Sequence, residues 1–293
     1  MRKQNSKFNT NFISEEGSSL KNSDFFAYAE LDNFACYVLA DGIEDVADSE
    51  SAQEAVESII PKFQEKPSIS KGKIHGYLKH ANEVLLKAEK YMKLKASIVV
   101  AVTDYENVRF GYAGNVRAKL YRNNKMFYKT IDTSLSSEMV SKEMISEDAL
   151  SRHEQRSNLY TFLGQKGFSP VISGKIKLVD TDILILYTKG VWENVSEGEI
   201  DNIFAESGKD PKDALLKVEA VLLDKNLGYI DNYTIAGIYI DKVFIESDTK
   251  KKKRRKLILI VSIVSVVVIL GAIIALYFYK KYTKELKEDM NTL

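Results

Sequence analysis

Three charged residues that lie beside or close to apolar strand patterns could take part in chemistry in this chain. The residues concerned are Asp41, Lys189 and Asp231. A carboxylate can bind a divalent cation through its oxygens, whereas an ammonium group repels a cation. The chemistry open to this chain therefore depends on which of these groups share one site.

The remaining reactive side chains give little support for another kind of site. His75 and His80 fall on different faces of an expected helix, so they are poorly placed to share a metal ion. His153 lies in a polar loop without an acidic partner in the sequence. Cys36 is the single cysteine and sits in an apolar run, so it cannot form an internal disulfide. We interpret it as a core residue in a reducing compartment.

The composition describes an ordinary globular chain. It has 293 residues, 45% of them hydrophobic and 28% charged, with a formal net charge of +1. This length suits one large domain or two small ones. Basic residues are concentrated in the run 250–256, and the rest of the chain is not basic, which argues against nucleic acid as a partner.

Hydrophobic periodicity predicts two groups of strands with helices in pairs between them. The expected strands are 25–31, 34–40, 97–102, 108–112, 117–122, 125–129, 171–178, 183–188 and 233–239. The expected helices are 49–63, 73–94, 135–150, 197–206 and 211–225. This pattern predicts an α+β fold in which two packed antiparallel sheets are flanked by helix pairs.

Seven segments, in order, resemble conserved elements of the metal-dependent protein phosphatases, the type 2C-like PPM family of serine/threonine phosphatases. They are 22–26 (Asn-Ser-Asp-Phe-Phe), 38–47 (Val-Leu-Ala-Asp-Gly-Ile-Glu-Asp-Val-Ala), 112–118, 132–135, 156–164, 188–192 (Thr-Lys-Gly-Val-Trp) and 231–234 (Asp-Asn-Tyr-Thr). The resemblance implies an α/β/β/α sandwich, in agreement with the periodicity. It also implies hydrolysis of phosphoserine and phosphothreonine by water bridging two Mn²⁺ or Mg²⁺ ions.

Carried over position by position, the resemblance implies a reduced set of metal ligands. Asp41, the Gly42 carbonyl and Asp231 match ligand positions of the family. The degenerate positions are Ser23 for a glutamate, Lys189 and Asn115 for aspartates, and Val46 for a histidine. Asp24, Glu44 and Asp45 could supply auxiliary carboxylates, although Glu44 and Asp45 are better interpreted as a solvated turn.

Charge decides what these substitutions mean. Four carboxylates balance two divalent cations, whereas two carboxylates and one ammonium leave a single net negative charge. An ammonium about 4 Å from a carboxylate gains about 4 kcal/mol at an effective dielectric constant of about 20. We therefore expect Lys189 to pair with Asp41 or Asp231, and we expect no cofactor or at most one weakly bound Mn²⁺ or Mg²⁺ ion. The alternative is that Lys189 points into solvent and one metal ion still binds.

The segment 257–279 carries no charged side chain and predicts a membrane helix. At about 1.5 Å per residue it is long enough for a hydrocarbon core of about 30 Å. The basic run 250–256 favours a cytoplasmic location for everything before it, in a single-pass topology. Gly271 and Ala275 would permit homo-oligomer contacts through this helix. The expected organisation is an N-terminal segment 1–12, a domain 13–245, a basic linker 246–256, the helix 257–279 and an extracytoplasmic tail 280–293.

These observations predict a pseudophosphatase anchored in the cell membrane. Its cytoplasmic domain would act as a binding or scaffolding module of a bacterial envelope signalling or secretion complex. The expected partners are the lipid bilayer and a cytoplasmic protein, including a phosphorylated or kinase-like one. The alternative is a weakly active metal-dependent serine/threonine phosphatase, so the sequence leaves enzymatic activity open while favouring its absence.

Overall fold

The structure of the chain is a computed structural model. It describes residues 5–43, 50–88, 93–225, 228–245 and 265. The helices and strands named below all lie in the compact unit Met1–Phe244.

Two antiparallel sheets form the centre of this unit. The first sheet contains, in spatial order, β1 (Lys7–Glu15), β11 (Tyr233–Lys242), β10 (Ile183–Tyr187), β6 (Arg117–Arg122) and β7 (Lys125–Lys129). The second contains β2 (Asp24–Glu30), β3 (Ala35–Gly42), β4 (Ala96–Thr103), β5 (Asn107–Ala113) and β8 (Val171–Ile172), with β9 (Ile176–Lys177) also paired to β5.

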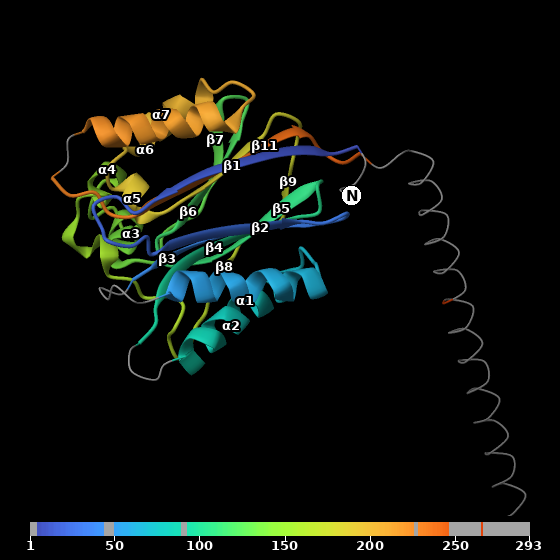
Figure 1. Ribbon diagram of the computed structural model, residues 1–293, viewed down its shortest axis with the longest axis horizontal. Coiled ribbons are helices and arrows are strands. Elements are labelled where there is room, and N and C mark those ends of the chain that lie inside the picture. Colours follow the sequence, from blue (N-terminus) through green and yellow to red (C-terminus); the bar gives the residue numbers. More distant parts are fainter. Residues whose placement is uncertain (1–4, 44–49, 89–92, 226–227, 246–264, 266–293) are drawn as a thin grey trace, which may run out of the picture. The chain divides into compact units, whose positions relative to one another are not determined.

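Helices cover the outer face of each sheet, as Figure 1 shows. The pair α1 (Ser51–Glu65) and α2 (Lys71–Ala88) packs on the second sheet. The pair α6 (Glu197–Ala205) and α7 (Pro211–Asp224) packs on the first. Three short helices, α3 (Leu135–Ser141), α4 (Glu147–Leu150) and α5 (Lys189–Trp192), lie in connections between strands.

The apolar pattern of the strands explains the layers. Side chains of β3 and β4 are buried on both faces, because one face meets the first sheet and the other meets α1 and α2. In α1, Ala52, Val56, Ile59 and Phe63 form one buried stripe at the spacing of helical turns. The result is three apolar layers: one between the sheets and one under each helix pair.

The predicted architecture of two antiparallel sheets flanked by helix pairs is confirmed. The expected start of the domain at residue 13 falls inside β1, which begins at Lys7 and pairs with β11 along its length. The sequence of β1 gives little indication of a strand, because Phe8 is its only buried side chain and polar residues occupy most other positions.

Two other predicted elements are interrupted. The helical stretch 135–150 consists of α3 and α4, separated at Glu143, whose φ of 58° lies outside the right-handed helical region. The predicted strand 171–178 is divided into β8 and β9, with Ser173 hydrogen-bonded to the backbone of Phe110 between them.

Within the described part of the chain, the structure contains no helix with the length and apolar character needed to cross a bilayer. Apart from Ser265, the predicted membrane segment 257–279 lies outside that part, as does the basic run 250–256.

Candidate functional site

The polar residues singled out in the sequence meet at one end of the two sheets. β2 begins and β3 ends there, the β5–β6 turn lies there, and α5 and β11 begin there. A pocket of about 650 Å³ opens between these connections. Its lining includes Ser23, Asp41, Gly42, Asn115, Lys189 and Asp231. The structure therefore brings the retained and the substituted positions together, while Glu44, Asp45 and Val46 lie outside the described residues.

Two carboxyl groups stand side by side at the base of this region. Asp24 on β2 and Asp41 on β3 are direct cross-strand partners. Asp24 is 6% exposed, and burial raises its pKa to about 7 against the lowering effect of hydrogen bonds from Thr188 and Thr234. Burial and the neighbouring Asp24 charge also raise the pKa of Asp41 well above its usual range. Both carboxyl groups are therefore harder to ionise in this position than in water.

Thr188 joins the two sheets behind the pocket. Its Oγ1 donates a hydrogen bond of 2.7 Å to Asp24 Oδ2 on the second sheet. The same oxygen accepts a bond of 2.9 Å from the backbone N–H of Thr234 on the first sheet. Thr188 is completely buried, so these bonds form without competition from water. They fix the point at which β10 gives way to α5.

Lys189, the first residue of α5, reaches from this point across the pocket. Its Nζ lies 2.8 Å from Asp231 Oδ2 and 3.6 Å from Glu193 Oε2. Burial alone would lower the pKa of Lys189, but the hydrogen bond and charge of Asp231 outweigh burial and raise it. The pairing of Lys189 with Asp231 is one of the two expected from the sequence.

Ser23 and Asn115 make local contacts at their positions. The backbone N–H of Ser23 donates to Asn232 Oδ1 at 3.1 Å, and its carbonyl accepts from the N–H of Gly42. Asn115 Oδ1 accepts a hydrogen bond of 2.8 Å from Ser97 Oγ. A neutral amide suits this buried pairing with a hydroxyl, so Asn115 acts here as part of the structure of the turn.

Asn232 fastens the loop that forms one wall of the pocket. Its Nδ2 donates to the carbonyls of Glu16 and Lys21, at 2.8 and 3.0 Å. Because Asn232 directly follows Asp231, the loop 16–23 is held against the carboxylate that Lys189 binds. This role is additional to the ligand positions that the resemblance implies.

The chain was compared with protein-family models and with curated proteins. No protein-family model matches the chain. A curated relative, the serine/threonine phosphatase stp of Listeria welshimeri, is 27% identical over 157 residues. That match spans 52% of this chain and 61% of the relative, so the chain matches less than two thirds of the relative's length.

Solved structures extend the likeness over most of the chain. The serine/threonine phosphatase Stp1 from Staphylococcus aureus matches with a TM-score of 0.71 at 19% identity, covering 84% of this chain and 98% of Stp1. The catalytic domain of the phosphatase PstP, in complex with 2 manganese ions, matches with a TM-score of 0.69 at 14% identity, covering 80% of this chain and 98% of that domain. The chain has the fold of the PPM-type serine/threonine phosphatases.

This likeness corrects the expectation about cofactors. We expected no cofactor, or at most one weakly bound ion, because the carboxylate count is reduced. The PPM fold is nevertheless that of metal-dependent phosphatases, and the PstP domain of the same fold binds 2 manganese ions. The expectation is therefore wrong as a statement about this fold, since it treated a substituted site as one without metal.

The side chains of this PPM fold fit a divalent cation under one condition. Asp24, the cross-strand partner of Asp41, has a buried Oδ1 without a hydrogen-bond partner, and Asp41 and Asp231 line the pocket. Across the described residues, however, no three His, Cys, Asp or Glu side chains are arranged around one metal position. The Lys189 ammonium already occupies Asp231. The oxygens of Asp41 and Asp231 therefore become available together to a cation only after Lys189 has released Asp231.

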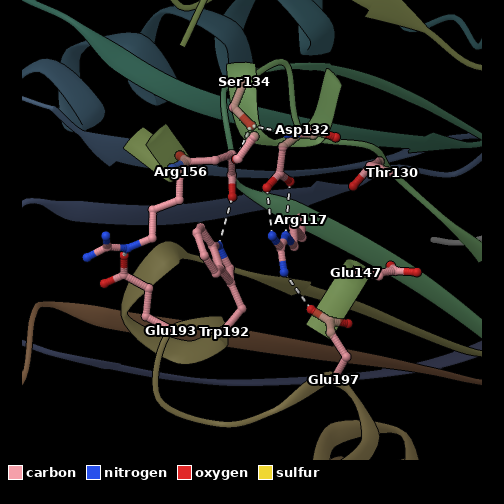
Figure 2. A network of polar contacts seen from close by, with 12 residues as sticks. Arg117, Thr130, Asp132, Ser134, Glu147, Arg156, Trp192, Glu193 and Glu197 are labelled. Carbon is pink, nitrogen blue, oxygen red and sulfur yellow. Dashed lines mark hydrogen bonds and ion pairs between the residues drawn. The ribbon is translucent and has the colours of Figure 1, made fainter. Parts of the chain in front are cut away.

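The lining of a second cavity, of about 650 Å³, includes Arg117, Asp132, Trp192 and Glu197. Figure 2 shows the network of polar contacts around these residues. Arg117 donates to both oxygens of Asp132, at 2.9 and 2.7 Å, and to Glu197 at 2.6 Å. Its guanidinium group lies over the Trp192 ring, 3.9 Å from the ring centre. Trp192 Nε1 in turn donates to the carbonyl of Asn115 at 3.0 Å. This network holds Trp192, the last residue of α5, against Asn115 in the β5–β6 turn.

Sequence reasoning did not assign roles to Thr188, Glu193 or Arg156. Figure 2 shows Arg156 directed at Glu193, with which it forms an ion pair through Nε. Lys189 and Glu193 are four residues apart at the start of a short helix, and this spacing predicts their contact. The contact with Arg156 joins distant segments, so local spacing carries no sign of it.

Proposed function

We propose that this chain is a membrane-anchored pseudophosphatase whose PPM-fold domain binds partners instead of turning over phosphorylated substrates. The observation that supports the proposal is the ion pair of Lys189 with Asp231 at 2.8 Å inside the pocket. This pair places a positive charge on a carboxylate that two-metal hydrolysis would need.

The neighbouring positions support the same conclusion. Two divalent ions acting on a phosphoester need a dense set of oxygen ligands, since Mn²⁺ and Mg²⁺ are hard cations. Ser23 and Asn115 contribute no carboxylate to the pocket, and Asn115 is committed to Ser97. The proposal concerns turnover and not metal content, so a bound divalent cation is compatible with it.

A binding role is supported by the pocket itself. Despite the substitutions it remains open, with a volume of about 650 Å³. Its lining residues include Lys21, Lys189, Ser18, Ser19 and Ser157, which carry ammonium or hydroxyl groups. Such groups donate hydrogen bonds to phosphate oxygens. A phosphorylated or kinase-like cytoplasmic protein is accordingly the proposed partner.

The proposed location rests on the sequence. The uncharged segment 257–279 would anchor the chain, and the basic run 250–256 would hold the domain on the cytoplasmic side. A bacterial envelope signalling or secretion complex is the setting we propose for a domain held close to the bilayer.

The alternative is a weakly active metal-dependent serine/threonine phosphatase. It is favoured by the carboxyl groups of Asp24, Asp41 and Asp231, which remain at one end of the sheets. A cation held by them would polarise a phosphoryl oxygen and activate water. Activity would then require Lys189 to leave Asp231.

Hydrolysis assays on the full-length chain in detergent micelles separate the two functions. Wild type and Asp41→Asn are compared with Mn²⁺ present, on p-nitrophenyl phosphate and on a phosphothreonine peptide. We expect equal background rates for both. A triple variant, Ser23→Glu, Asn115→Asp and Lys189→Asp, restores the carboxylate positions and serves as the positive control. Wild-type hydrolysis that Asp41→Asn abolishes would establish the alternative instead.

A further inference from the structure

We infer that Lys189 is a built-in competitor for the divalent cation of this pocket and that Glu193 is the second position for its ammonium group. With Lys189 on Asp231 the cation is excluded, and with Lys189 on Glu193 the pocket is open to it. The inference takes only the pocket from the proposed function and holds whether or not the chain hydrolyses a substrate.

The position of the ammonium group between two carboxylates is the first argument. Lys189 Nζ lies 2.8 Å from Asp231 Oδ2 and 3.6 Å from Glu193 Oε2. Lysine carries a compact charge on a flexible stem of four carbons. A small rotation of that stem therefore exchanges one partner for the other, without any movement of the backbone of α5.

Glu193 is prepared to receive the charge. Its side chain is 15% exposed, and its Oε1 is held by Arg156 Nε. Arg156 is itself held in place through Nη1, which donates to the carbonyl of His153 at 3.2 Å. Arg156 and Lys189 approach different oxygens of Glu193. The ammonium group can thus move closer to Oε2 while the ion pair with Arg156 remains intact.

Asp231 is the point of competition. Its Oδ1 accepts a hydrogen bond of 3.0 Å from the backbone N–H of Asn232, which fixes the carboxylate. The other oxygen, Oδ2, is the atom that Lys189 holds. A divalent cation bound between Asp41 and Asp231 would come close to this oxygen, where the Lys189 ammonium group would repel it. The Lys189–Asp231 ion pair therefore opposes cation binding.

Thermodynamic linkage turns this opposition into a measurable coupling. A cation that binds only when Lys189 has left Asp231 must shift Lys189 away from Asp231. Removal of Lys189 must therefore raise the affinity for the cation by the free energy that the displacement of Lys189 costs. Glu193 lowers the free energy of the displaced state. Its removal should therefore weaken cation binding only while Lys189 is present.

The test is a double-mutant cycle read by Mn²⁺ binding and not by hydrolysis. Full-length wild type, Lys189→Ala, Glu193→Gln and the double variant are titrated with Mn²⁺ in detergent micelles, by calorimetry and by the paramagnetic signal of free Mn²⁺. Lys21→Ala is the matched control, because Lys21 lines the same pocket but pairs with Glu50 at 3.2 Å. Thermal unfolding of each variant confirms that it is folded.

We expect Lys189→Ala to tighten Mn²⁺ binding by a factor within the range of about 5 to 150 that is usual for coupled sites, and Lys21→Ala to change it far less. Glu193→Gln should weaken binding in the wild-type chain and leave it unchanged in the Lys189→Ala background. Equal effects of the two lysine substitutions on Mn²⁺ affinity would overturn the competitor role. They would show that the loss of any positive charge from the pocket changes the affinity. An effect of Glu193→Gln that persists without Lys189, or absence of Mn²⁺ binding in folded Lys189→Ala, would overturn the inference as well.

Discussion

At the scale of single residues, the geometry of the pocket depends on close backbone contacts as well as on charge. Gly190 follows Lys189 and lies against the backbone of Asn232, where an added Cβ would come within 2.0 Å of the carbonyl oxygen. Only a residue without a side chain lets α5 approach the start of β11 this closely. The position of the Lys189 ammonium group near Asp231 therefore depends on its glycine neighbour.

Gly190→Ala should destabilise the domain by about 3 kcal/mol or more, because neither backbone can move away without breaking sheet contacts. Chemical unfolding with urea measures this change. Gly198→Ala in α6 is the matched control, since nothing lies within 4 Å of its added Cβ. Equal stability of the two variants would show that α5 can shift away from β11.

Cys36 should resist modification in the native chain. It is completely buried on β3, and burial raises the pKa of its thiol well above the usual range. The thiolate, which is the reactive form, is therefore scarce as well as inaccessible. Iodoacetamide at about pH 8.5, near the ordinary thiol pKa, should label the chain only after unfolding in guanidinium. Because the chain has 1 cysteine, mass spectrometry reports this site alone, and rapid labelling of the folded chain would contradict the prediction.

At the scale of elements, α6 depends on its first turn. Ser196 Oγ accepts from the backbone N–H of Glu199, and the Glu199 carboxylate accepts from the backbone N–H of Ser196, which makes a capping box. Lys225, beyond α7, reaches the same carboxylate at 2.8 Å. These contacts fix the start of the helix that carries Glu197 and Asp201, the partners of the buried Lys119 at 2.5 Å each.

Ser196→Ala should cost about 1 kcal/mol of stability through loss of the cap. The control is Ser146→Ala, because Ser146 precedes α4 without any side-chain capping bond. Urea unfolding of the two variants gives the comparison. A loss of stability in Ser146→Ala as large as in Ser196→Ala would show that removal of a serine, and not of the cap, is responsible.

The same box predicts a pH dependence. Hydrogen bonds from Lys225 and Ser196 lower the pKa of Glu199 to about 2 from 4.5. A lowered pKa stabilises the folded state above the unfolded value of 4.5, and this contribution disappears as the pH falls toward 2. Because Glu199 is exposed to solvent by 40%, the contribution is small. The stability difference between wild type and Glu199→Gln should shrink between pH 7 and pH 3, and a constant difference would contradict this assignment.

At the scale of the whole molecule, the first strand belongs to the domain. β1 pairs with β11 from Lys7 to Glu15, and Phe8 reaches the core between the sheets. A chain that begins at residue 13 should be less stable by about 3 to 5 kcal/mol, because it lacks the buried Phe8 ring. Thermal unfolding of this chain, against one lacking only residues 1–4, measures the loss. Equal stability would mean that residues 7–12 of β1 add nothing to the stability of the domain through their pairing with β11.

Membrane attachment is a second prediction at this scale. We expect the full chain in the membrane fraction of cells and a chain without 257–293 in the soluble fraction, because no other uncharged stretch of that length is present. An alkaline phosphatase reporter placed after residue 293 should be active outside the cytoplasm. A soluble full-length chain, or an inactive reporter on a membrane-bound one, would contradict the proposed topology.

Much of the fold could be predicted because its signals are local. The buried strands β3 and β4 read as continuous apolar runs, and α1 as a helical stripe. β1 escaped prediction because an edge strand with one fully buried residue has almost no period of two. The interruption between α3 and α4 depends on a single backbone angle, at Glu143, which no periodicity encodes.

Some contacts of the candidate site could be predicted from the sequence, and others could not. The pairing of Lys189 with Asp231 could be predicted from charge, given the order of the segments. The resemblance could not reveal that Thr188 binds both sheets, that Asn232 fastens the loop 16–23, or that Arg156 holds Glu193. Those contacts join residues far apart in the chain, so they exist only once the sheets are packed.

The pairing of β1 with β11 has a consequence for synthesis on the ribosome. Every strand of the second sheet has been made by Lys177, so that sheet can assemble early. The first sheet stays in two parts, β1 on one side and β10, β6 and β7 on the other, until β11 emerges and joins them. Asp231 lies two residues before β11, so the nascent chain carries Asp41 and Lys189 before Asp231, the partner of Lys189, has been made. The pocket is thus completed by nearly the last residues of the domain to be translated.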